Sequence, residues 1–221
     1  MAITYPRTMP SEGAETQNFT LQRVDFGTAD GAGRMASVTS GEPLWRLEIN
    51  LGEMDADTAD AWRAWLRSLR GAGKTFYARD LRRPYPKAYP AGFSGLNRHG
   101  GGGFPADGAP TSWSLNGTRD VLTLTGLPST FAIKAGDLIG FVWSTTRRAM
   151  VAAIEDVTAS GGVLAVTVEP PVPQAVSGSA AIKLAGVEAV MRLIPGEGGI
   201  GAESSVTTAG GQIVAIQDLR P

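Results

Sequence analysis

The residues that could take part in catalysis are few in this sequence and form no recognisable set. Of the 221 residues one is histidine, His99, and none is cysteine. Hydrolysis by a Ser-His-Asp triad needs a serine held beside the histidine, and the sequence contains no Gly-x-Ser-x-Gly elbow. Without cysteine there is no thiolate chemistry and no disulfide. We expect His99 to be an exposed loop residue with no partner and no catalytic role, and we expect no enzymatic activity.

Three carboxylates, Asp55, Asp57 and Asp60, lie close together in the sequence. Their spacing does not match the ligand loops that bind calcium or zinc. They stand where an apolar helical pattern begins, and a side-chain oxygen there can accept a hydrogen bond from a first-turn amide. We therefore interpret them as helix caps and dipole partners, and we expect no metal and no other cofactor.

The run Gly71-Ala72-Gly73-Lys74-Thr75 ends like a phosphate-binding loop. Such a loop needs a further glycine six residues before the lysine, where this sequence has Ser68. It also needs a strand before it and a helix after it, so that the helix amides face the phosphate. Here the expected order is helix, then strand, so we exclude a nucleotide site.

A segment over residues 79–89 combines basic and aromatic side chains between prolines. It could pair with phosphates and stack on bases, although arginine and tyrosine are also favoured in protein interfaces. The formal net charge is −1, so the chain has no overall basic field to attract nucleic acid. We favour a subunit interface formed by Arg79, Arg82, Arg83, Tyr85, Lys87 and Tyr89.

Residues 80–111 show no regular period and include the run Gly100 to Gly103. A loop of about thirty residues is unusual inside a domain, where it is normally functional or disordered. Prolines favour an extended backbone that reaches far per residue. We therefore expect residues 79–110 to leave the fold and lie against a neighbouring subunit, with 90–110 as a flexible glycine-rich arm.

The elements that position these residues are clearest in the first part of the chain. Residues 44–51 alternate between apolar and polar side chains, which predicts a half-buried strand. Residues 55–71 carry apolar side chains at i, i+3, i+4 and i+7, which predicts a helix with one apolar stripe. A strand over 75–79 follows. The residues that define this core are Trp45, Trp62, Trp65, Leu66 and Leu69.

Most of the remaining chain is typical of short strands joined by tight turns, with 29 glycines and 14 prolines. Two strands enclose a turn at 27–33, residues 149–157 are expected to pair with 163–168, and a second glycine-rich loop covers 196–211. We expect no helix between 111 and 184, and a small barrel or sandwich there. The start of the chain lacks a signal-peptide core. No apolar run approaches the roughly 20 residues of a membrane span, so we expect no membrane insertion.

The order of these segments resembles that of siphophage and prophage tail-tip proteins of the distal tail protein kind. There a half-buried strand leads into a helix ending Leu-x-Gly and then into a strand with Thr-Phe; the matching runs here are residues 43–49, 61–71 and 74–80. A Lys-x-Gly-Asp strand, a strand ending in two prolines and the closing strands match residues 133–139, 164–172, 191–193 and 213–219.

The resemblance implies a mainly β protein with one helix. It implies a tail-tube-like β-sandwich over 1–89 and 186–221, with helix 55–71 at its side and a small β-barrel domain inserted over 111–185. It also implies a non-enzymatic subunit of a hexameric ring, with tail tube and tail-tip or hub proteins as partners and no specific nucleic-acid binding. Such a protein is assembled in the bacterial cytoplasm and resides in the virion tail. The alternative is a β-sandwich module that binds carbohydrate or a receptor.

Overall fold

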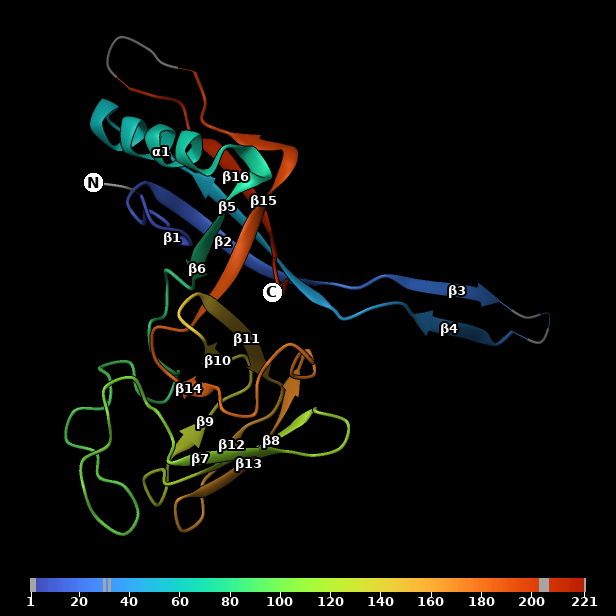
Figure 1. The fold of residues 1–221 in the computed structure, drawn as a ribbon, viewed down its shortest axis with the longest axis vertical. Coiled ribbons are helices and arrows are strands. Elements are labelled where there is room, and N and C mark those ends of the chain that lie inside the picture. The colour runs from blue at the N-terminus through green and yellow to red at the C-terminus, as the bar shows by residue number, and fades with distance from the viewer. Residues whose placement is uncertain (1–2, 30, 32, 203–206, 221) are drawn as a thin grey trace.

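The computed structural model describes residues 3–29, 31, 33–202 and 207–220 (Figure 1). Over these residues the chain is mainly β, with several sheets, one α-helix and one short 3₁₀ turn. The expected fold class is thus confirmed. Two six-stranded sheets carry most of the strands, and each has its own apolar core.

The first sheet collects strands from both ends of the chain. Its order is β1-β6-β15-β16-β5-β2. The strands are β1 (Arg7–Thr8), β2 (Ala14–Gln22), β5 (Leu44–Leu51), β6 (Thr75–Arg79), β15 (Glu188–Gly199) and β16 (Gly211–Gln217). Only the β1–β6 pair is parallel. In β5 the alternation predicted from the sequence is present, since Trp45, Leu47, Ile49 and Leu51 are buried.

Helix α1 (Ala56–Leu69) covers one end of this sheet (Figure 1). Asp55 caps its first turn by accepting a hydrogen bond from the Thr58 amide at 2.8 Å, and this bond lowers the pKa of Asp55. At the other end Arg70 adopts a left-handed conformation, and the 3₁₀ turn η1 (Gly71–Gly73) leads into β6. The predicted helix and its aspartate cap are therefore confirmed.

The apolar stripe of α1 is one residue narrower than expected. Trp62, Trp65 and Leu69 are buried, together with Ala59. Leu66 is only half-buried, so its place in the buried core was predicted wrongly. The tryptophans lie edge to face with ring centroids 5.5 Å apart, and Trp65 packs on Phe76 at 4.9 Å. These two rings fill the space above the sheet, which leaves Leu66 at the margin.

The edges of the first sheet are linked through one amide side chain. Gln17, on edge strand β2, donates from Nε2 to the Arg79 carbonyl at 2.7 Å and accepts from the Leu81 amide at 2.8 Å. Arg79 ends β6, which lies near the opposite edge in the strand order. The sheet therefore curls so that its two edges approach each other. Gln17 provides hydrogen-bond partners for a backbone carbonyl and a backbone amide that have none in a neighbouring strand.

The second sheet has the order β14-β10-β11-β13-β8-β7. Its strands are β7 (Ser112–Leu115), β8 (Val121–Thr125), β10 (Leu138–Trp143), β11 (Arg147–Ala153), β13 (Val163–Glu169) and β14 (Ala181–Lys183). A short pair, β9 (Ala132–Ile133) and β12 (Val157–Thr158), lies beside it. The expected hairpin across the Asn116-Gly117 turn is present as the antiparallel β7–β8 pair.

One predicted pairing is present but short, and one predicted loop needs correction. Strand β11 pairs with β13 as predicted, although over two residue pairs, and β13 also pairs with β8 along most of its length. Between these strands β12 pairs with β9, and the chain turns back at Gly161 and Gly162, where Ser160 and Val163 form an antiparallel bridge. In the glycine-rich loop expected over 196–211, residues 196–199 extend β15, and 203–206 lie outside the described residues.

The two sheets touch along β10, β11 and β15. The indole N–H of Trp45 in β5 donates to the Met150 carbonyl of β11 at 2.8 Å, and Met150 is fully buried in the first core. Arg148 of β11 pairs with Glu188 of β15, and its guanidinium lies 3.9 Å from the centre of the Tyr77 ring. The contact is thus apolar at its centre and charged at its margin.

Beyond the first sheet, a hairpin of β3 (Asp25–Ala29) and β4 (Met35–Thr39) continues the β2–β5 ribbon and projects away from both sheets (Figure 1). Gly27 belongs to β3, so the turn expected from residue 27 begins later than predicted. Residues 30 and 32 of that turn lie outside the described residues.

Candidate subunit interface

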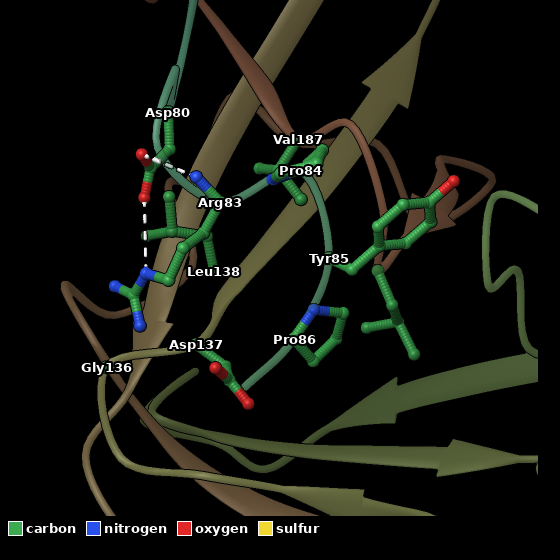
Figure 2. Close-up of a pocket in the computed structure, with 10 residues that line it drawn as sticks. Asp80, Arg83, Pro84, Tyr85, Pro86, Gly136, Asp137, Leu138 and Val187 are labelled. Carbon is green, nitrogen blue, oxygen red and sulfur yellow. Dashed lines mark hydrogen bonds and ion pairs between the residues drawn. The ribbon is translucent and has the colours of Figure 1, made fainter. Parts of the chain in front are cut away.

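The segment predicted as an interface begins where the chain leaves β6 and crosses to the second sheet. Asp80 shapes its first turn, because its carboxylate accepts from the amides of Arg82 at 2.8 Å and Arg83 at 3.1 Å. The Arg83 Nε also forms an ion pair with this carboxylate (Figure 2), at a distance of 3.7 Å. A side chain that binds amides two and three residues ahead fixes a tight local turn.

Asp137 holds the next part of the segment on the second sheet. It is 4% exposed and accepts from the Lys87 amide at 2.9 Å and from the Lys134 amide at 2.8 Å. Lys87 in turn donates from Nζ to the Ala135 carbonyl. A buried carboxylate needs such donors, because burying it unpaired would cost several kcal/mol. Asp137 therefore ties the crossing segment to the turn before β10.

A small pocket lies between Asp80 and Asp137, and Figure 2 shows its lining. Its volume is about 20 Å³, which is room for roughly one water molecule. Polar groups reach it from both aspartates and from Arg83, while Leu138 and Val187 line the remainder. A cavity of this size cannot hold an organic substrate, so we interpret it as part of the junction.

The two tyrosines of the predicted interface face the second core instead of leaving the fold. The Tyr89 ring stacks on Phe131 with centroids 4.6 Å apart, and its hydroxyl accepts from the Ala132 amide at 2.9 Å. Tyr85 packs edge to face on Phe93 at 5.7 Å. Tyrosine suggested a subunit interface because its ring and hydroxyl suit any partly buried contact. Here the contact lies within the chain.

Residues 90–110 do not extend away from the fold, which contradicts the predicted arm. Phe93 and Phe104 are buried in the second core. Gly100, Gly101 and Gly102 all have positive φ, a conformation that glycine adopts without strain. They form a turn that lets the Phe104 amide reach the Leu96 carbonyl at 2.9 Å. The glycines thus form a tight turn. The glycine content of the sequence alone does not distinguish such a turn from a mobile loop.

Arg98 fastens this turn to the second sheet. Its guanidinium donates to the Gly126 carbonyl, to the Ala109 carbonyl at 2.7 Å and to the Thr111 hydroxyl at 3.2 Å. The same group lies 5.4 Å from the centre of the Phe104 ring. One side chain therefore joins both ends of the 98–111 segment.

His99 is exposed, as expected, but it does have a partner. Its Nδ1 lies 3.0 Å from the Ser129 hydroxyl, and its backbone amide donates to the Leu127 carbonyl at 2.9 Å. Its side chain also lies so close to Gly162 that a Cβ there would come within 2.5 Å. The expectation of a partnerless histidine is wrong, because the glycine turn brings it onto the second sheet.

A larger cleft lies between the two sheets at the curled edge of the first. Its volume is about 710 Å³, within the range of sites that accept large side chains or small ligands. One wall is the stretch of β2 from Ala14 to Phe19, and the floor includes Trp45. The other wall consists of Asp80, Leu81, Arg82, Arg83, Gly136, Leu138 and Ala152.

The predicted interface residues are therefore divided by the structure. Arg82, which is exposed, and Arg83, which is half-buried, line the larger cleft. Lys87 is exposed beside it and bonds to the second sheet. Arg79 is half-buried at the end of β6. Tyr85 and Tyr89 point into the second core. Whether any of them contacts another subunit stays a prediction.

Two residues of this junction were missed from the sequence. Gln17 lies in an ordinary polar alternation, and its partners are more than sixty positions away. Asp137 was noted within a Lys-x-Gly-Asp run, but nothing nearby in the sequence indicates that Lys87 would bind it. Within the described residues no three histidines, cysteines or carboxylates are placed to bind a metal, and no helix there has the length and apolar character to cross a membrane.

No protein-family model matches this chain, and a search of the curated proteins finds no match either.

Proposed function

We propose that this protein is a structural subunit of a phage or phage-like tail. It forms a hexameric ring at the distal end of the tail tube and connects the tube to the tail tip and its host-recognition apparatus. It acts by assembly and not by catalysis. It is assembled in the bacterial cytoplasm and resides in the virion tail.

The observation that carries this proposal is how the tail-tip-like segments meet in space. The first three of them form β5, α1 and β6, and the closing segments form β15 and β16. All five elements belong to one sheet and the helix that covers it. Segments that resemble one family in chain order thus build one compact unit, which is what a shared fold requires.

A carbohydrate-binding module is less well supported. Such a module presents several aromatic rings on one exposed face, where sugars can stack. Among the described residues Phe26 is the one exposed aromatic side chain, and it lies on the projecting hairpin. The other rings are buried or half-buried.

The native mass tests the proposal. We expect purified protein to contain a species of six times 23.1 kDa by light scattering, and annular particles by negative-stain electron microscopy. Addition of the tail tube protein from the same genome should increase the annular fraction. A chain that remains monomeric at every concentration and with the tube protein present would overturn the proposal. A monomer retained on a polysaccharide column would favour the binding module.

A further inference from the structure

The β3–β4 hairpin carries the most exposed large apolar side chains of the described residues. Every described residue of its two strands is exposed. Met35, Val38 and Phe26 are 76%, 69% and 65% exposed, the three highest values among the large apolar side chains. Single exposed apolar residues are common, but a contiguous group marks an interaction site.

Phe26 and Val38 share one face of the hairpin, whereas Met35 lies on the other. Phe26 pairs directly with Val38, so their side chains share a face. Because side chains alternate along a strand, Val24 lies on that face as well. The opposite face carries Asp25 and Thr39, which share a hydrogen bond of 2.5 Å, and near the hairpin's far end it also carries Met35. The Phe26–Val38 face is therefore the more apolar of the two near the base of the hairpin, and an apolar sheet face is normally covered.

The hairpin is held in its projecting position by contacts at its base. Arg23 pairs with Glu169 of the second sheet. Glu42, on the other side of the base, accepts from the Gln174 amide at 2.8 Å. An isolated two-stranded hairpin is marginally stable in water, so these contacts alone do not account for its order beyond the base. A covering surface would supply the missing apolar contacts.

The position of the large cleft indicates which surface covers the hairpin. The hairpin leaves β2 at its carboxyl end, after Gln22, whereas the cleft is lined by β2 from its start at Ala14 to Phe19. The hairpin and the cleft thus lie toward opposite ends of the β2–β5 ribbon. A surface at one end of a subunit that fits a surface at the other end gives a head-to-tail contact, and such contacts close into rings when the rotation permits.

We propose that the β3–β4 hairpin is a docking arm, and that its Val24-Phe26-Val38 face lies in the β2 cleft of a second copy of this chain. The inference rests on the proposed ring and names the contact that builds it. The arm covers residues 23–40, close to the ~20–30 residues that one partner contributes to a standard interface. Its arginines and aspartates are equal in number, which gives no basic face for anionic lipid.

The first experiment compares assembly of two double variants. In Phe26→Ser/Val38→Ser the apolar face of the arm is removed. In Ile154→Ser/Val163→Ser, the control, two apolar residues that are 55% and 47% exposed on the second domain are removed. Sedimentation velocity over a concentration series measures assembly of each full-length protein, and circular dichroism checks folding. We expect the arm variant to need roughly a hundredfold more protein, because it loses two apolar side chains and each contributes about one factor of ten.

The second experiment identifies the acceptor and uses the absence of cysteine from the chain. Two single variants, Val38→Cys on the arm and Asn18→Cys on the cleft wall, are mixed and treated with a short bis-maleimide. We expect a cross-linked dimer that contains one chain of each kind. Val38→Cys mixed with Ile154→Cys is the control and should give no such product above background.

The outcomes separate the arm from the ring. If the wild-type protein assembles and the arm variant assembles equally well, the docking arm is wrong while the ring proposal stands. If the arm variant fails to assemble but Val38→Cys does not cross-link to Asn18→Cys, the arm's place in the cleft is wrong. A wild-type protein that never assembles overturns both.

Discussion

At the scale of single residues, the junction between the sheets depends on side chains that bind backbone groups. Gln17, Asp80 and Asp137 each accept hydrogen bonds from amides that no strand partner satisfies. The tryptophans do the converse, since the indoles of Trp62 and Trp65 donate to the carbonyls of Glu12 at 2.7 Å and Thr8 at 3.0 Å. Polar contacts of this kind fix where the loops lie, and the apolar cores alone would not.

Changing Asp137 to asparagine should weaken this junction. The carboxylate accepts from two backbone amides, and an asparagine would place an NH₂ group against one of them. We expect a loss of ~2–3 kcal/mol in the free energy of unfolding, measured by urea denaturation at constant m-value. Asp60→Asn is the matched control, since the Asp60 side chain is 75% exposed. If the two variants had equal urea midpoints, the hydrogen bonds of Asp137 would not stabilise the junction.

Asp218 should make stability depend on pH in the acidic range. Hydrogen bonds from Arg220, and then from Arg192, lower its pKa from 3.8 to about 2. A carboxylate with a lowered pKa stabilises the folded state above its unfolded pKa, and this contribution is lost as pH falls from about 4 to about 2.

The measurement is the free energy of unfolding of wild type and Asp218→Asn across that range. Because the ion pairs are partly solvated, we expect a difference of about 1 kcal/mol at neutral pH that shrinks toward pH 2. Arg220→Gln should reduce the same difference. A gap between wild type and Asp218→Asn that stays constant from pH 6 to pH 2 would contradict this assignment.

Residue-scale contacts were also the part of the site that the sequence predicted least. Arg82 and Arg83 line the larger cleft. Their charge and the turn that Asp80 forms beside them are both visible in the neighbouring sequence. The packing of Tyr85 and Tyr89 on the second core was not predicted, because ring type alone does not distinguish a contact within the chain from one between chains. Gln17 and Asp137 were missed, because their partners are brought close only by the completed fold.

At the scale of elements, α1 and β5 were predicted because their patterns are local. An apolar stripe at helical spacing and an alternating strand pattern can both be recognised within a short stretch of sequence. The β11–β13 pairing was predicted correctly, but the longer pairing of β13 with β8 was not predicted, because the choice of that partner depends on a strand elsewhere in the chain. The prediction of a flexible arm over residues 90–110 was wrong for a similar reason. Phe93 and Phe104 follow no periodic pattern, so the sequence did not indicate that they would be buried.

The helix allows a graded test of burial. Trp65 is 1% exposed, so Trp65→Ala should lower the free energy of unfolding by ~3–5 kcal/mol. Leu66 is only half-buried, and Leu66→Ala should cost about 1 kcal/mol. Arg67→Ala, at an exposed position, provides the baseline. If Leu66→Ala proved as damaging as Trp65→Ala, the orientation of the helix would be different from the one described.

At the scale of the whole molecule, two long segments outside the first sheet differ in their packing. The hairpin over 23–40 is exposed along both strands. Residues 90–110 are fastened by Arg98 and by two buried aromatic rings. The number of glycines is high in both, so composition does not distinguish them, but burial does.

Limited trypsin digestion should show this difference in the isolated chain. We expect early cleavage after Arg34, which is exposed on the hairpin, and late cleavage after Arg98, whose guanidinium is bound to the second sheet. Mass spectrometry of the fragments over time gives both rates. Cleavage after Arg98 that is as fast as after Arg34 would mean that residues 90–110 are loosely held.

The place where the second sheet is inserted has a consequence for how such a chain can change. The chain leaves the first sheet at Arg79 and returns at Glu188, and these two residues pair with each other across β6 and β15. Entry and exit are thus neighbours in one ladder, so a short loop could join them without altering the strand order. The insertion behaves as a cassette, and related chains could exchange it for a different domain while the helix-covered sheet is retained.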